Sequence, residues 1–90
     1  TVASTIFRIV QESLQNVMKH SKADQVKISL TSNDYFEIRI EDNGIGFSEQ
    51  NFSTTYGLKN MQERAKSINM ILKIESEINK GTRVSITDSL

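Results

Sequence analysis

In the middle of the chain, residues 41–47 read Glu-Asp-Asn-Gly-Ile-Gly-Phe, an acidic strand end followed by two glycines spaced two apart. A carboxylate at the end of a strand can accept a hydrogen bond from the amino group of a ligand. The glycines let the backbone approach that ligand closely and adopt positive φ. Asp-Asn-Gly also forms ordinary hairpin turns, so the meaning of this segment depends on what the rest of the chain places beside it.

The composition is that of one small globular domain. The 90 residues include 11 basic and 11 acidic side chains, and 37% are hydrophobic. Because the charges balance, we expect no nucleic-acid partner and no direct contact with an anionic membrane. The chain has no cysteine and one histidine, which excludes disulfides, thiolate metal sites and a His-rich metal centre. We expect a single excised domain at residues 1–90, without a signal peptide or a membrane-spanning run.

The first predicted element is a helix from residue 1 to about residue 20. Its apolar side chains recur at helical spacing, at Ile6, Ile9, Val10, Leu14 and Val17. Ser4 or Thr5 is the expected N-cap.

A polar stripe lies off that apolar face and comprises Glu12, Asn16, Lys19 and His20. One interpretation is a solvated helix face. The other is a polar wall over a ligand, because amide and carboxylate oxygens suit a hard cation.

Four strands are predicted from alternating apolar residues. The first two carry Val26, Ile28 and Leu30, then Phe36, Ile38 and Ile40, and we expect them to be half-buried in an antiparallel hairpin that ends at Asp42. The last two carry Met70, Leu72 and Ile74, then Val84 and Ile86, with a turn at residues 79–81 between them.

A second helix is predicted from Gly57 to about Ile68, with Leu58, Met61, Ala65 and Ile68 on one side. Its first turn offers free backbone N–H groups to a phosphate. Glu63 and Arg64 are interpreted as surface or pairing residues.

Residues 47–56, before this helix, are predicted to form either a surface loop without a function or a lid. This order predicts an α+β fold, a two-layer sandwich with the helices on one face of a mainly antiparallel sheet.

Four motifs in this order resemble the ATP-binding domain of sensor histidine kinases. Residues 8–20 resemble its N box, residues 42–47 and 57–65 its two glycine boxes, and residues 81–84 its last motif. The sequences Gln-Glu-Ser-Leu-Gln-Asn and Met-Gln-Glu-Arg-Ala are most similar to the corresponding segments of nitrate-sensor-type kinases. Kinases of this type signal to a LuxR-type DNA-binding response regulator. The resemblance covers nearly the whole chain and implies the Bergerat (GHKL) fold, without a Walker P-loop.

At the adenine end, the resemblance implies that Asp42 accepts a hydrogen bond from the exocyclic amine and that Thr82 supports the same edge, directly or through water. Gly44 and Gly46 let the chain turn against the base, and Ile45 between them is included among the ATP-binding residues.

At the phosphate end, it implies that Asn16 supplies an oxygen to Mg²⁺ and that Glu12 serves as a Mg²⁺ or water-shell ligand. Lys19 and His20 lie near the phosphates, and Gly57 and Leu58 close the end of the lid with backbone N–H groups. His20 is not the phosphorylated histidine, because in this family the acceptor belongs to a separate dimerisation helix.

The implied function is that of a histidine kinase domain in two-component signalling, which binds Mg²⁺-ATP and donates the γ-phosphate to a histidine on the dimerisation domain. We expect a cytoplasmic domain, and this expectation is compatible with a membrane anchor elsewhere in the parent protein. Two alternatives stay open. Thr55 and Asn60 replace glycines that are usual in the family, which allows a nucleotide-binding or partner-binding module without transfer. The other is an ATP hydrolase in which Glu12 is the base.

Overall fold

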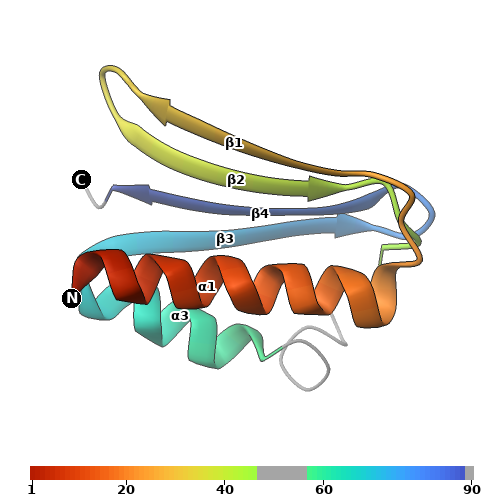
Figure 1. The fold of residues 1–90 in the computed structure, drawn as a ribbon, viewed down its shortest axis with the longest axis horizontal. Coiled ribbons are helices and arrows are strands. Elements are labelled where there is room, and N and C mark those ends of the chain that lie inside the picture. The colour runs from red at the N-terminus through yellow and green to blue at the C-terminus, as the bar shows by residue number, and fades with distance from the viewer. Residues whose placement is uncertain (47–56, 89–90) are drawn as a thin grey trace.

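The computed structural model describes residues 1–46 and 57–88, and Figure 1 shows how they are arranged. In chain order the elements are helix α1 (Val2–Asn16), the π-helical turn η1 (Val17–Ser21), strands β1 (Val26–Ser32) and β2 (Phe36–Asp42), helix α3 (Leu58–Ser67), and strands β3 (Met70–Glu77) and β4 (Gly81–Asp88). The predicted order of elements is confirmed. The predicted loop or lid at residues 47–56 lies outside the described residues.

The described strands form one antiparallel sheet in the order β1-β2-β4-β3. Both helices lie on one side of it, α3 against β3, and α1 against α3 and β2 (Figure 1). The predicted α+β two-layer sandwich is therefore confirmed. Strand β4 enters between β2 and β3, and its register places Thr82 opposite Asp42 on one neighbour and opposite Ser76 on the other.

The core lies between the helices and the sheet. Its buried members are Ile9, Ile40, Met61, Ala65, Met70, Leu72, Val84 and Ile86. Four more predicted apolar positions of the first helix, Ile6, Val10, Leu14 and Val17, are half-buried. Full burial of a side chain the size of isoleucine contributes about 1.5–3 kcal/mol, so this cluster dominates the stability of the fold.

Strand β1 corrects one expectation about burial. Its alternating residues Val26, Ile28 and Leu30 are 41%, 53% and 65% exposed, rather than half-buried. They face the same side of the sheet as Ile40 and Ile38 of β2, to which Ile28 and Leu30 are paired. Helix α1 packs against β2, and β1 lies beyond β2 at one edge of the sheet. The strand and its pairing were predicted correctly, and the burial was not.

The predicted cap of the first helix is also wrong. Thr1 is the N-cap, because its hydroxyl accepts the backbone N–H of Ser4 at 3.1 Å in a reciprocal capping box. The helical run continues to Ser21, and Lys22 ends it with a φ of 54°. Since the last turn is π-helical, α-helical spacing does not continue from Asn16 to Lys19 and His20. None of the described helices is both long and apolar enough to span a bilayer.

Candidate functional site

A pocket opens between the end of α1 and the strands β2, β4 and β3. It is lined by Ser13, Asn16, Val17, Ser21, Ile40, Asp42, Gly46, Ile74, Thr82 and Val84. Four of these were predicted from the sequence as ligand-binding residues: Asn16, Asp42, Gly46 and Thr82. Segments from four separate parts of the chain therefore meet in one cavity, with an apolar floor and a few polar groups, which is the usual character of a small-molecule site.

Asp42 is the last residue of β2 and is half-buried. One of its carboxylate oxygens accepts the backbone N–H of Gly44 at 2.8 Å, which fixes the side chain over the turn that follows the strand. An ionised carboxylate has acceptor capacity for about four hydrogen bonds, so this contact leaves capacity for a ligand. The next side chain, Asn43, holds the same turn, since its amide oxygen accepts the N–H groups of Asp24 at 2.9 Å and Gln25 at 3.0 Å.

The glycines of this segment lie against protein backbone. A Cβ on Gly44 would collide with the carbonyl oxygen of Ser21, and a Cβ on Gly46, whose φ is 65°, would collide with that of Glu77. Between them, the N–H of Ile45 donates to the carbonyl of Ser21 at 2.7 Å. Only Gly46 of the three lines the pocket. The glycines therefore allow the loop to fit between η1 and the turn before β4.

Thr82 belongs to a hydroxyl pair with Ser76 of β3. The two hydroxyl oxygens are 2.8 Å apart, and the Ser76 hydroxyl also donates to the carbonyl of Gly81 at 3.2 Å. Asp42, Ser76 and Thr82 together line a second, open depression that adjoins the pocket. Gly81 is needed at this place, because its φ is 96° and a Cβ would collide with the carbonyl oxygen of Asp42.

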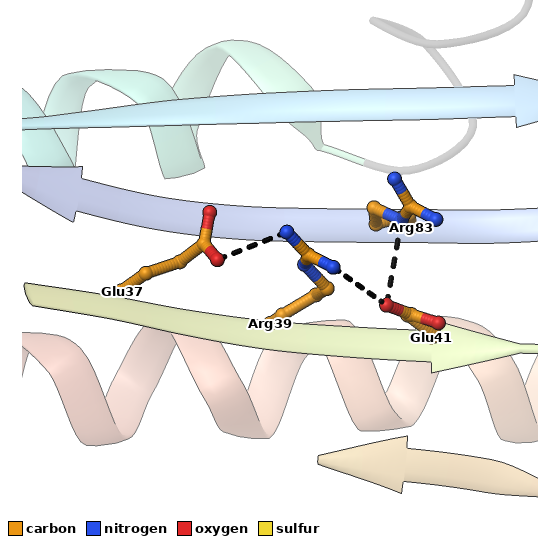
Figure 2. Close-up of polar contacts among 4 residues, drawn as sticks. All are labelled: Glu37, Arg39, Glu41 and Arg83. Carbon is orange, nitrogen blue, oxygen red and sulfur yellow. Dashed lines mark hydrogen bonds and ion pairs between the residues drawn. The ribbon is translucent and has the colours of Figure 1, made fainter. Parts of the chain in front are cut away.

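A charged ladder lies on the face of the sheet opposite the helices (Figure 2). Arg39 contacts Glu37 at 3.0 Å and Glu41 at 3.4 Å, and Arg83 contacts Glu41 at 3.4 Å. Glu41 and Arg83 are register partners, next to the register partners Asp42 and Thr82. The same pair of strands therefore carries an ion pair on one face and two ligand-binding candidates on the other.

The residues predicted to bind phosphate are less concentrated around the pocket than those predicted to bind adenine. Asn16 lines the pocket, whereas Lys19 is exposed and His20 is half-buried in η1, and neither lines it. Gly57 caps α3 with a φ of 64°, and Leu58 packs against the core. Ile45, 44% exposed, is likewise absent from the pocket lining.

Glu12 and Asn16 were predicted to hold a metal ion. The amide oxygen of Asn16 is a suitable donor for Mg²⁺ at the pocket wall. Glu12 instead faces α3, where its carboxylate contacts Arg64 at 3.5 Å. This contact confirms the interpretation of Arg64 as a pairing residue. Within residues 1–46 and 57–88, no three His, Asp or Glu side chains form a metal-binding group, so most ligands of a bound Mg²⁺ would have to be phosphate oxygens and water.

Sequence reasoning missed three serines around the site. Ser13 lines the pocket and donates its hydroxyl to the carbonyl of Ile9 at 2.9 Å, and Ser21 donates to that of Val17 at 2.7 Å. Ser76 supports Thr82 from β3. The available signal was their position: each is a polar residue at a place where the helix or strand pattern directs the side chain inward.

Comparison with protein families gives one match over almost the whole chain. The family described as histidine kinase-, DNA gyrase B- and HSP90-like ATPase matches residues 1–88. Among curated proteins, the sensor protein VraS of Staphylococcus epidermidis is 42% identical over 83 residues, and that of Staphylococcus aureus is 41% identical over 83 residues. Both alignments cover 90% of this chain and 24% of the relative, so the chain spans about a quarter of the length of these relatives.

Solved structures give the same fold. The histidine kinase AdeS of Acinetobacter baumannii superposes with a TM-score of 0.80 at 19% identity, covering 96% of this chain and 46% of that one. The histidine kinase domain of a blue-light activated kinase of Erythrobacter litoralis superposes with a TM-score of 0.76 at 24% identity, covering 98% of this chain and 47% of the other. At these identities the likeness establishes the fold.

Proposed function

Because this chain belongs to the histidine kinase-, DNA gyrase B- and HSP90-like ATPase family, we propose that residues 1–90 form a single ATP-binding catalytic domain of a sensor histidine kinase. The observation that carries the proposal is that Asn16, Asp42, Gly46 and Thr82, taken from three separate sequence motifs, line one pocket. The VraS relatives are named sensor proteins, which supports a role in signalling.

Adenine would bind at the Asp42–Thr82 end of the pocket. Asp42 would accept a hydrogen bond from the exocyclic amine, and Thr82 would support the same edge. A site built on a carboxylate acceptor discriminates against a base with an oxygen at that position, because two acceptors then face one another without a proton. Apolar residues such as Ile40 and Val84 would contact the ring. Gly46 and the neighbouring Gly44 and Ile45 would shape the loop beside the base.

The phosphates would extend from the pocket toward the end of α1. Asn16 would hold Mg²⁺, with Glu12 contributing through its water shell, and the ion would supply positive charge beside the phosphates. Lys19 and His20 would add charge and hydrogen-bond donors. Gly57 and Leu58, at the start of α3, would offer backbone N–H groups to the phosphate chain.

The reaction we propose is transfer of the γ-phosphoryl group to a histidine on a separate dimerisation domain of the same kinase. The bond from the γ-phosphorus to its bridging oxygen breaks, a P–N bond to the imidazole forms, and ADP leaves. Positioning and charge neutralisation provide most of the catalysis in such transfers. The ion pair of Glu12 with Arg64, at 3.5 Å through one carboxylate oxygen, directs the carboxylate toward α3 and so favours transfer over hydrolysis with Glu12 as the base.

We also propose the nitrate-sensor-type subfamily, with a LuxR-type response regulator as the partner of the parent kinase. This proposal is supported by the similarity of residues 11–16 and 61–65 to the sequences of that subfamily. We place the domain in the cytoplasm, where ATP and the regulator are found.

Calorimetry of ATP, ADP and GTP, with and without Mg²⁺, tests the binding site. We expect selective binding of adenine nucleotides, and a loss of at least about tenfold in ATP affinity on Asp42→Asn, since a hydrogen bond to a charged acceptor contributes about 1.5–3 kcal/mol. Undiminished binding by Asp42→Asn would show that Asp42 does not read the base. Transfer is tested by mixing the domain with its dimerisation domain and following labelled phosphate. Label on His20 of the isolated domain would contradict the proposed acceptor.

A further inference from the structure

The hydroxyl of Ser76 contacts two oxygen atoms of β4. It donates to the carbonyl oxygen of Gly81 at 3.2 Å, and it lies 2.8 Å from the hydroxyl oxygen of Thr82. Ser76 and Thr82 are register partners on β3 and β4, and both are half-buried. The carbonyl of Gly81 is held in place, because the glycine packs against the backbone of Asp42 and a Cβ would not fit between them.

A serine hydroxyl has one proton and two lone pairs. Because a carbonyl oxygen can only accept, both contacts are hydrogen bonds only when Ser76 donates to Gly81 and Thr82 donates to Ser76. In this arrangement Thr82 has no proton left for a ligand, and its two lone pairs are acceptors. Both Thr82 and its strand partner Asp42 line the pocket. The pair therefore offers acceptors to a ligand.

We propose that Ser76 is a positioning residue that orients the Thr82 hydroxyl as an acceptor and thereby increases the preference of the pocket for adenine over 6-oxopurines. The inference rests on the proposed function, because it assumes that adenine binds between Asp42 and Thr82. An amino group at position 6 has protons for both acceptors, whereas a 6-oxo group has none.

The same preference for adenine follows if a water molecule lies between Thr82 and the base. A water that donates one proton to Thr82 has its second proton for N1 of the ring. In adenine N1 is an acceptor, and in hypoxanthine and guanine it carries a proton. An acceptor at Thr82 therefore favours adenine by either route. Without Ser76, the Thr82 hydroxyl could rotate and donate to a 6-oxo group, and the preference would fall.

The test compares ATP with inosine triphosphate, which differs at position 6 and N1 but lacks the 2-amino group of guanine. Dissociation constants are measured by calorimetry with Mg²⁺ for the wild type and for Ser76→Ala. We expect the preference for ATP over inosine triphosphate to fall about fivefold, the effect of one hydrogen bond of ordinary strength. Ser76→Thr, which keeps the hydroxyl, should retain the wild-type preference. A structural role would weaken both nucleotides equally and leave the ratio unchanged.

Two further variants make the result decisive. Ser29→Ala removes a half-buried hydroxyl from β1 of the same sheet, away from the pocket, and should leave the ratio at its wild-type value. Thr82→Val removes the hydroxyl that Ser76 is proposed to orient. In the Thr82→Val background, Ser76→Ala should cause no further change in the ratio, and an additional fall of similar size would overturn the proposal.

Asp42→Asn, measured in the same series, separates this inference from the proposed function. If Asp42→Asn binds ATP as well as the wild type, adenine does not bind at this place, and both the function and the inference are overturned. If Asp42→Asn loses ATP binding while Ser76→Ala keeps the wild-type ratio, the function stands and the role of Ser76 is overturned.

Discussion

Some residues around the pocket both hold the local backbone in place and are proposed to bind the ligand. Asp42 accepts the N–H of Gly44, and the same carboxylate is the proposed acceptor for adenine. Gly44 in turn touches the end of η1, where the carbonyl of Ser21 takes the place that a Cβ would need. The sequence predicted a functional role for both residues. It could not predict the contact with Ser21, because that contact joins residues more than twenty positions apart in the chain.

Gly44 and Gly57 provide a matched pair of substitutions. Gly44→Ala should lower the free energy of unfolding by about 1–3 kcal/mol, because the new Cβ overlaps backbone that has little room to move. Among the described residues, nothing lies within 4 Å of the Cβ that Gly57→Ala introduces, and this variant should lose only about 1 kcal/mol through its positive φ. Urea unfolding of both variants measures the difference. A neutral Gly44→Ala would contradict the close approach.

At the scale of elements, β1 and β2 have the same alternating pattern and different surroundings. Ile40 of β2 is 1% exposed beneath α1, and Leu30 of β1 is 65% exposed. Periodicity gives the strand and the face toward which its side chains point. It does not give the strand over which a helix will lie, because that depends on contacts between distant segments. The strands were therefore predictable, and the burial of β1 was not.

Alanine substitutions at these two positions should differ sharply. Ile40→Ala should cost about 2–5 kcal/mol, because it removes buried methyl groups and leaves a cavity. Leu30→Ala should change the free energy of unfolding by about 0.5 kcal/mol or less, since most of the side chain is already in solvent. Chemical denaturation followed by circular dichroism tests both. Equal losses would mean that β1 is covered in solution.

At the scale of the whole molecule, the order and pairing of the elements bring the residues of the pocket together. Asn16, Asp42 and Thr82 lie in three motifs that the sequence orders correctly, and antiparallel pairing of β2 with β4 brings the last two together. The lining residues with recognisable motifs were therefore predictable. Ser13, Ser21 and Ser76 occupy inward-facing positions, but their roles were not predictable, because the role of a serine depends on the hydroxyl or carbonyl that it meets after folding.

Nucleotide binding should therefore stabilise the entire domain. At Mg²⁺-ATP concentrations one hundred times the Kd, the free energy of unfolding should rise by about 2.7 kcal/mol, because only the folded chain has the pocket. Differential scanning calorimetry should show a higher Tm with ATP and a smaller change with GTP. Asp42→Asn should show a smaller increase at the same ATP concentration, about 1.4 kcal/mol or less, because its Kd is expected to be at least about tenfold higher. An equal increase in the variant would place the nucleotide elsewhere.

The ion pair of Glu41 with Arg83 also bears on the accuracy of folding. Because neighbouring residues of a strand face opposite sides, a slip of one position between β2 and β4 would turn Arg83 toward the pocket and Thr82 away from it. The slipped sheet would bury an arginine beside Asp42, and a carboxylate paired in this way has less capacity to accept the adenine amine. Nucleotide binding would therefore report correct strand pairing, and retention on an immobilised ATP analogue would separate correctly paired molecules from slipped ones.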